Sequence, residues 1–223
     1  MKKSLIAVIC FGFLFFISSM SHAEQGEYGL ALKAGTLGVG AEATIGIVEN
    51  INARIGLNYL SLDYDGSESN VDYAVELDLM TISLLFDWHP AGNGFRLTAG
   101  ALYNGNEVEA IGEPTNGNFT IDDTPYNTTQ VGTLKAEIDF NSFAPYVGIG
   151  YGNAVGKTQK WSFVFDLGVM YQGSPDVSFT ATGTSAGNAT FLSELENERR
   201  QLESEIEDFQ FYPVISFGIS YKF

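Results

Sequence analysis

Cysteine, histidine and basic residues are scarce in this chain. It contains 1 Cys, 2 His and 11 Lys and Arg residues against 27 Asp and Glu residues, which gives a formal net charge of −16. An acidic chain of this kind is a poor partner for nucleic acid, which binds basic surfaces. It also lacks the basic clusters that bind anionic lipid head groups. Cys10 lies in a segment that we expect to be removed, so the sequence predicts neither a disulfide framework nor a thiol nucleophile.

The first residues have the pattern of a secretory signal peptide. Two lysines precede an apolar run from Leu5 to Ile17, and Ser21-His22-Ala23 supplies the small residues of a cleavage site. We therefore expect residues 1–23 to be cleaved and residues 24–223 to form one domain. The apolar run is shorter than the roughly 20 residues of a membrane-spanning helix, and no run of that length follows. This pattern excludes a helical membrane protein.

In the last segment, Phe211–Phe223, every second residue is apolar, and the residues between them include Ser216, Gly218, Ser220 and Lys222. Alternation with a period of two is typical of a β-strand with one apolar face. The segment is long enough to cross a bilayer, which takes about 9–11 residues of a tilted strand. It resembles the C-terminal signal by which Gram-negative outer-membrane barrels are recognised for assembly. This resemblance assigns the signal to Phe217, Ile219, Tyr221 and Phe223.

Alternating segments of this kind recur through the chain, and few prolines (6) interrupt them. We predict ten strands, at residues 28–34, 37–47, 51–65, 73–88, 95–108, 131–140, 145–151, 161–171, 177–182 and 211–223. Short turns alternate with longer polar loops at residues 65–72, 111–130, 152–160 and 183–208. This asymmetry is typical of outer-membrane barrels, in which the long loops face outside. The predicted fold is an all-β, antiparallel, up-and-down transmembrane β-barrel of 10 strands. Eight strands is the alternative if the Gly35 turn or the Val177 segment is not a strand boundary.

Two neighbouring strands change their apolar face midway. In Ile51–Asp65 the apolar residues are odd-numbered up to Tyr59 and even-numbered from Leu60. Tyr73–Trp88 changes phase in the same way between Leu79 and Met80. Because a shift of one residue reverses the two faces of a strand, each change predicts a β-bulge, and the two bulges together predict a shared bend.

At this point the chain resembles the small proteobacterial outer-membrane barrels of the OmpA/OmpX type. The segments that carry the resemblance are Tyr28–Gly35 and Phe143–Tyr151, although their motifs are generic. The resemblance implies localisation in the cell outer membrane. It also implies contact with outer-membrane lipid and lipopolysaccharide, and assembly by the outer-membrane barrel assembly machinery. Because the family includes adhesins, slow pores and enzymes, the resemblance leaves the activity open.

The positions predicted to face the barrel interior carry both signs of charge. They are Lys33, Glu42, Arg54, Asp87, Arg96, Lys135, Glu137, Asp139, Asp166 and Lys222. Opposite charges must meet in a narrow interior, because an unpaired buried ion is costly. Two interpretations stay open: a solid ionic plug that holds the wall together, and a narrow gated ion path lined by these groups.

The remaining charge is expected outside the barrel. Asp63–Glu68 has the oxygen ligands and glycine with which a calcium loop begins, but no bidentate Glu follows, which favours a solvated acidic loop. Residues 191–209 form the only predicted helix, in the last external loop, with an apolar stripe and a Glu-rich face. The stripe predicts either a lid over the barrel or a docking surface.

We expect a structural or surface-interaction role, with an unknown ligand bound through the external loops at residues 111–130 and 183–208. The first alternative is a narrow cation-preferring diffusion pore. The second is an envelope hydrolase with an unrecognised carboxylate site at Asp63, Asp65 or Asp78. No enzyme activity, cofactor or metal is predicted, because His89 is the only histidine after residue 23 and adjoins a turn.

Overall fold

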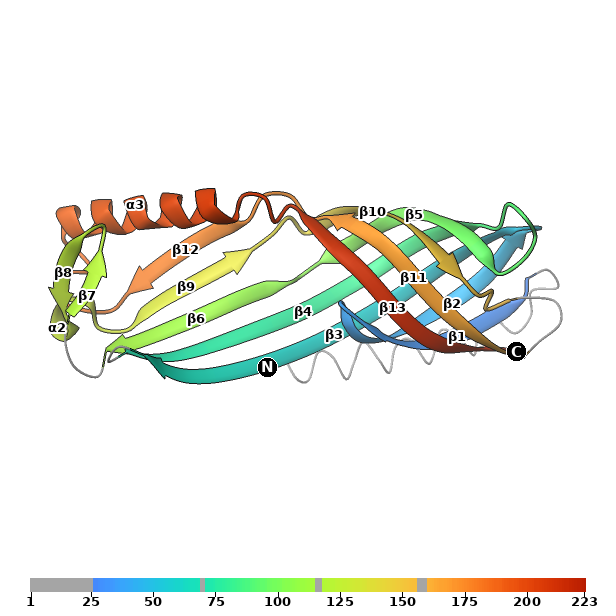
Figure 1. Ribbon diagram of the computed structural model, residues 1–223, viewed down its shortest axis with the longest axis horizontal. Helices are drawn as coiled ribbons and strands as arrows, with labels where there is room; N and C mark the ends of the chain where they lie inside the picture. Colours follow the sequence, from blue (N-terminus) through green and yellow to red (C-terminus); the bar gives the residue numbers. More distant parts are fainter. Residues whose placement is uncertain (1–25, 69–70, 115–117, 156–159) are drawn as a thin grey trace.

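The computed structural model describes residues 26–68, 71–114, 118–155 and 160–223, and its core is a closed barrel of eight antiparallel strands (Figure 1). Each strand pairs with the next in the order β1, β2, β3, β4, β5, β10, β11 and β13, and β13 closes the ring on β1. The strands are β1 Tyr28–Gly35, β2 Gly38–Val48, β3 Ile51–Glu68, β4 Val71–Trp88, β5 Phe95–Asn104, β10 Phe143–Tyr151, β11 Trp161–Tyr171 and β13 Phe211–Lys222.

One wall of the barrel continues beyond the rim as a sheet that we call the extension. The β3–β4 hairpin keeps its pairing from Ile51 and Trp88 at one end to Glu68 and Val71 at the other. The part of β4 from Thr81 to Trp88 pairs with β5, and the part from Val71 to Asp78 pairs with β6. The sheet then adds β9 and β12 at its edge (Figure 1). The added strands are β6 Glu107–Pro114, β9 Leu134–Asp139 and β12 Asp176–Ala181.

A short hairpin, a short helix and a long helix complete the extension, and the long helix runs from the tip along β12 toward the barrel (Figure 1). They are β7 Asn118–Ile121, β8 Thr124–Asn127, α2 Thr128–Val131 and α3 Ala189–Ile206. Phe191 and Leu195 of α3 are buried with Ile121 and Val131, and they pack against the β9 and β12 side chains Leu134, Phe179 and Ala181. The helix predicted at residues 191–209 therefore lies along the β12 edge of the extension. Among the residues that the structure describes, no helix is long and apolar enough to cross a membrane.

The closed barrel has the eight strands of the alternative prediction, and the prediction of ten is not confirmed. The segments at 131–140 and 145–151 were predicted to be antiparallel neighbours joined by a turn. Instead, β9 pairs with β6 while β10 pairs with β5, and β5 and β6 both run antiparallel to β4. Hence β9 and β10 run in the same direction, one after the other, with β9 in the extension and β10 in the barrel. In the same way, β11 and β12 run in the same direction, with β11 in the barrel and then β12 in the extension. The polar residues between them mark the barrel rim, where the chain leaves one ladder and joins another.

This arrangement also changes which links lie at which end. β10 ends and β11 begins beside the start of β1 and the C-terminus, which we call the end with the termini, as the register pairs Gly29–Lys222 and Trp161–Tyr221 show. The described parts of the predicted external loop at 152–160 are therefore at the end with the termini, and residues 156–159 lie outside the described residues. The excursions between β3 and β4, β5 and β10, and β11 and β13 all leave from the opposite end (Figure 1).

The predicted β-bulges in β3 and β4 are absent, since the register of this hairpin runs without a shift from Ile51–Trp88 to Glu68–Val71. The change of apolar face has another cause. In the barrel, β3 turns Arg54 inward and Ile55 outward. In the extension, the same inner face carries Leu60 and Leu62, while the outer face carries acidic residues such as Asp63. The pairing register of β3 and β4 is therefore continuous. What changes along β3 is the environment of each face: the inner face changes from charged to apolar, and the outer face changes from apolar to acidic.

Candidate functional site

Six of the ten predicted interior charges meet across the barrel lumen in one network, contributed by six different strands. The central cation is Arg54. Its guanidinium lies 2.9 Å from Glu42, 2.7 Å from Asp87 and 3.3 Å from Asp166. The central anion is Asp166, which also lies 2.6 Å from both the Lys33 ammonium and the Arg96 guanidinium. The network is closed by the 3.2 Å pair between Lys33 and Glu42.

The network is electrically balanced, with three cations and three anions, and all six side chains are at most 10% exposed. Polar side chains extend it, because Thr98 donates a hydrogen bond to Asp87 at 2.7 Å and Ser216 donates one to Asp166 at 3.4 Å. Ions buried at this depth are tolerated only when each meets partners of opposite sign. The arrangement can hold the barrel wall together, and it leaves no side chain of the six without a partner.

The other four predicted interior charges lie elsewhere. Lys135, Glu137 and Asp139 are on β9, which belongs to the extension and not to the closed barrel. Their alternation resembles that of a barrel strand, which is why the sequence placed them inside. Lys222 is the last residue of β13 and pairs with Glu27 at 2.9 Å at the end of the barrel that holds the termini.

An apolar layer lies above the ionic network, on the side of the extension, and sequence reasoning missed it. It consists of Leu37, Leu85, Leu102, Ala144, Tyr146, Met170 and Val214. The Tyr146 ring lies against the inner wall over Gly148 and Gly168, which are opposite each other in the β10–β11 ladder. A Cβ atom on either glycine would lie 2.5 Å or less from the Tyr146 hydroxyl oxygen, so only glycine leaves room for the ring. The paired glycines at inward positions were the available signal.

Free space in the lumen is unevenly distributed. A cavity of about 30 Å³ remains between the ionic network and the apolar layer, which is room for very few water molecules. At the end with the termini, a polar cavity of about 1110 Å³ opens among residues that include Glu27, Asn52 and Asn153. This wide hollow is at the mouth of the barrel and is lined in part by the exposed residues Tyr151 and Phe163, whereas the lumen further along is filled by side chains.

Outside the barrel, the outer face of the extension is densely acidic. Carboxylates lie directly opposite one another on neighbouring strands. The register pairs are Asp63–Glu76, Asp72–Glu113, Asp78–Glu107, Glu76–Glu109, Glu107–Asp139, Glu109–Glu137 and Asp139–Asp176. Like charges in directly opposite positions destabilise a sheet. This face therefore weakens the extension, and the buried apolar contacts on the other face must offset the repulsion.

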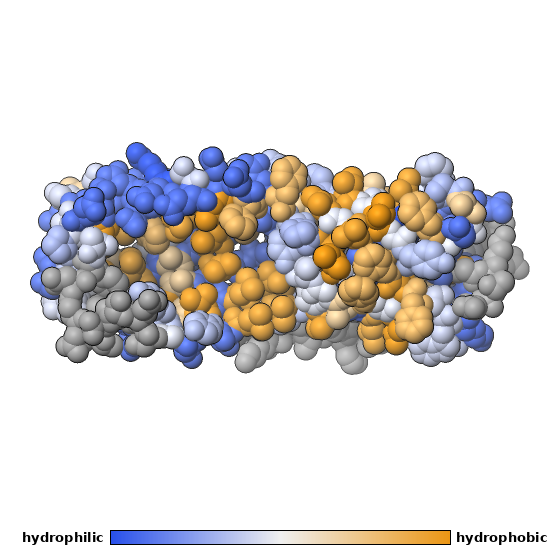
Figure 2. Space-filling view, in the orientation of Figure 1, coloured by the Kyte–Doolittle hydropathy of each residue, from blue (hydrophilic) through white to orange (hydrophobic). Residues whose placement is uncertain are grey.

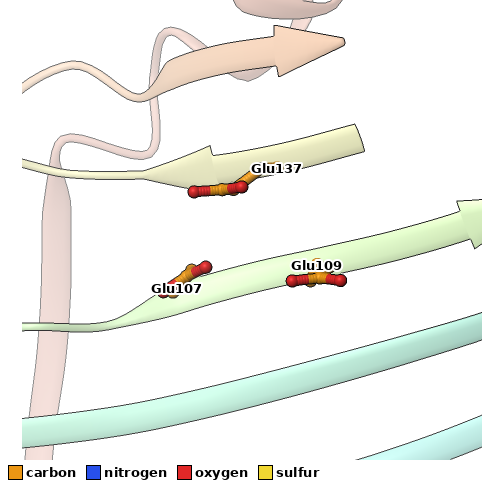
Figure 3. Close-up of side chains that lie close together, drawn as sticks. All are labelled: Glu107, Glu109 and Glu137. Carbon is orange, nitrogen blue, oxygen red and sulfur yellow. The ribbon is translucent and has the colours of Figure 1, made fainter. Parts of the chain in front are cut away.

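Three of these carboxylates have metal-like spacing. Oxygen atoms of Glu107, Glu109 and Glu137 lie within 4.8 Å of one another, and Figure 3 shows the three side chains on the neighbouring strands β6 and β9. Lys135 already compensates two of them, with its ammonium 2.9 Å from Glu109 and 3.1 Å from Glu137. The cluster is thus a partly neutralised acidic surface. The calcium-loop pattern at Asp63–Glu68 lies in strand β3, where successive side chains point to opposite faces.

Raising the pH is expected to weaken the extension more than the barrel. The neighbouring Asp78 carboxylate raises the pKa of Glu76, and burial together with Asp176 raises the pKa of Asp139. A group whose pKa is raised by folding contributes stability below its unfolded pKa and loses it as the pH rises through the folded pKa. The loss begins above the ordinary pKa values of 4.5 for Glu76 and 3.8 for Asp139. Amide hydrogen exchange in β6 and β9, corrected for intrinsic rates, should show less protection at neutral pH than at mildly acidic pH.

The pH experiment has two controls. The amides of β1 and β2, in the barrel wall, should show no matching change in protection. The variant Glu76→Gln should flatten the pH dependence in β6, because it removes one titrating partner from the face. If protection in β6 and β9 rises with pH instead, the carboxylate repulsion does not govern the stability of this sheet.

His89 has no catalytic surroundings. Its ring is buried in the link between β4 and β5, where Nδ1 lies 2.9 Å from the Asn93 carbonyl oxygen and Nε2 lies 3.2 Å from the Asn52 amide nitrogen. These contacts fix the link. The Asp63 and Asp65 side chains lie far along β3 on the outer face of the extension, so the described residues do not bring them to His89.

Comparison with known proteins supports the fold. A scan against protein-family models finds no match, and neither does a search of the curated proteins. Among solved structures, the chain is similar to Acinetobacter baumannii CarO2, with 21% identity, a TM-score of 0.57 and coverage of 90% of this chain and 100% of that one. Acinetobacter baumannii CarO has 20% identity, a TM-score of 0.54 and coverage of 87% and 97%. A major outer membrane protein from Thermus thermophilus has 14% identity and a TM-score of 0.46 over 90% of this chain and 100% of that one, which is too low to carry an argument.

The similarities to CarO2 and CarO confirm the predicted all-β antiparallel barrel. The narrower resemblance to the OmpA/OmpX type stays a prediction.

Proposed function

We propose that this chain is an integral outer-membrane β-barrel protein with a closed lumen, and that its role is structural and in surface interactions made by the extension. The localisation predicted from the sequence agrees with the fold and with the outer surface of the barrel. That surface carries an apolar band, whose exposed residues include Ile55, Leu84, Phe86, Val147, Ile149, Phe163, Leu167, Phe217 and Ile219. An outward apolar band of this kind is typical of barrels that contact lipid.

Aromatic girdles border the band. At the end with the termini, the exposed aromatic residues are Trp88, Phe95, Tyr151, Trp161 and Phe223. At the rim below the extension they are Tyr59, Tyr103, Phe143, Tyr171 and Phe211. Tyrosine and tryptophan favour the two membrane–water interfaces because their rings are apolar and their polar atoms stay hydrated. In Figure 2 the apolar side chains of the barrel lie in the right half of the molecule.

The orientation follows from the links between strands. Outer-membrane barrels have short periplasmic turns and longer extracellular loops. The three long excursions leave the rim opposite the termini, which supports an orientation with the extension outside the cell and the end with the termini in the periplasm. Lipid and lipopolysaccharide would surround the band, and Phe217, Ile219, Tyr221 and Phe223 would be the signal for the barrel assembly machinery. The predicted loops at 111–130 and 183–208 belong to the extension, apart from residues 115–117, which lie outside the described residues.

The observation that carries the proposal is the filled lumen. A cation-preferring pore would need a continuous water path past Arg54, Asp166 and Tyr146, but these side chains belong to two successive layers across the barrel. An ionic network of this type stabilises the wall at the expense of permeation. A pore is the alternative, and it would require the side chains of the ionic network and of the apolar layer to move together so that water could pass.

Planar-bilayer recording of the refolded chain, residues 24–223, tests the proposal. We expect no steady unitary conductance, because the ionic and apolar layers fill the lumen. The same preparation must migrate as a folded barrel on an unheated gel, and a channel of known conductance must be detected in the same bilayer. Steady, cation-preferring openings from the folded chain would contradict the closed lumen and make transport the leading function.

A further inference from the structure

The extension has a free strand edge close to the barrel rim. Strand β2 pairs with β3 only as far as Val39 and Tyr59, whereas β4 pairs with β3 as far as Glu68. From Ser61 onward, the side of β3 that faces away from β4 has no neighbouring strand among the described residues. A free edge presents unpaired backbone groups and is a template for another strand.

The ladder shows which residues present these groups. In antiparallel pairing, successive residues point their N–H and C=O groups alternately to the two sides of a strand. The Met80 carbonyl accepts from Gly105 on the β5 side, so the odd-numbered residues of β4 bond to β3. Their partners in β3 are the even-numbered residues, such as Leu62 opposite Leu77. The backbone groups of Ser61, Asp63 and Asp65 therefore point to the free edge.

The inner face beside this edge is apolar and uncovered. Leu62 is 52% exposed and Tyr64 is 71% exposed, although both lie outside the apolar band of the barrel. Tyr73, on the neighbouring strand of the same face, is 40% exposed. Helix α3 covers this face at the opposite edge of the sheet, through contacts with β9 and β12. Figure 2 shows apolar side chains gathered over the extension, next to the hydrophilic α3.

The outer face beside the edge is acidic. Asp63 and Asp65 point outward from β3, and Asp63 lies opposite Glu76 on β4. Asp72 continues the negative charge toward the tip. A strand added at this edge would place alternate side chains on the apolar face and on the acidic face. Opposite charges in directly opposite positions stabilise such a pair, and like charges destabilise it.

We infer that the free edge of β3 at Ser61–Asp65 receives an extended segment of a basic partner polypeptide, in which basic and apolar residues alternate. Backbone hydrogen bonds would give affinity, and the two faces would give specificity, as in other cases of strand addition. The inference rests on the proposed surface-interaction role and names the partner class. A second copy of this chain is a poor occupant, because the net charge is −16 and its own edge would oppose aspartate to aspartate.

The test uses the folded full-length mature chain in micelles and a short synthetic peptide of alternating lysine and valine. Binding should slow amide hydrogen exchange at Ser61, Asp63 and Asp65, while the β1 and β2 amides stay unchanged. A peptide of the same composition in scrambled order should bind more weakly, and a peptide of alternating glutamate and valine should not bind. Equal binding of the scrambled peptide, or no slowing at these three amides at saturation, would overturn the inference.

A matched pair of variants separates the edge from general electrostatic attraction. The double variant Asp63→Asn, Asp65→Asn should bind the lysine peptide roughly tenfold more weakly, because two cross-strand charge pairs are lost. The double variant Glu107→Gln, Glu137→Gln removes the same charge from the outer face away from the edge, and its affinity should stay close to that of the unchanged chain. Equal losses in both variants would overturn the assignment to the edge.

Self-association of the chain without peptide, with slowed exchange at the same three amides, would identify a second copy as the occupant and overturn the basic partner. Failure of peptide binding leaves the bilayer recording unaffected, so failure of this inference can be told apart from failure of the closed lumen.

Discussion

Replacing Arg54 by methionine should destabilise the barrel by about 3–5 kcal/mol, the usual effect of removing one partner from a buried ion pair. Arg54 is the only described cation that contacts Glu42, Asp87 and Asp166 together. Without it, three buried carboxylates share only Lys33 and Arg96. Methionine has a similar length and fills much of the same space, so the loss reports charge rather than a cavity. Urea unfolding of the refolded chain in micelles would measure the change in the free energy of unfolding.

The control for Arg54→Met is Lys222→Met. Lys222 pairs with Glu27, whose side chain is half exposed, at the open end of the barrel. A pair of this kind contributes at most about 1 kcal/mol. The two variants remove the same charge from the same barrel and differ in where the charge lies. An unchanged unfolding midpoint for Arg54→Met would remove the ionic network from the forces that hold the wall together.

Replacing Phe191 by alanine should detach α3 from the extension while the barrel stays folded. The Phe191 side chain is fully buried, and its ring packs edge-to-face on Tyr126 with the ring centroids 4.9 Å apart. Truncation of a buried phenylalanine typically costs about 3–5 kcal/mol. Few other buried side chains hold the helix to the sheet, so the cost falls on local unfolding. Amide hydrogen exchange should show loss of protection in α3 and β7–β8, with no change in β1, β11 and β13.

Leu192→Ala is the matched control for this variant, because Leu192 is the next residue of the same helix and is 48% exposed. It should change protection in α3 only slightly. Equal losses for Phe191→Ala and Leu192→Ala would mean that the helix is held by its polar contacts, such as the hydrogen bonds that Glu194 accepts from Thr124 and Tyr126.

The sequence alone determined the fold class, because the alternation of apolar and polar residues is a local property that each strand carries in itself. Phe211–Phe223 and Trp161–Tyr171 could be recognised as strands without knowledge of their neighbours. The alternation also identified the inward charges Lys33, Glu42, Arg54, Asp87, Arg96 and Asp166, whose positions follow from the pleat once the outward face is known.

The tertiary structure decided which strands pair and where the barrel ends. A polar interruption such as Asn141-Ser142 has the same composition whether the chain turns back or runs on into another ladder, so the predicted count of ten strands was not confirmed. The phase change at Tyr59–Leu60 was a true signal with the wrong explanation. Its physical reason is that the outward face meets lipid within the proposed membrane span and water beyond it, while the inner face changes from an ionic lumen to the apolar face of the extension. Only the surroundings of the strand, which are set by distant segments, distinguish that exchange from a bulge.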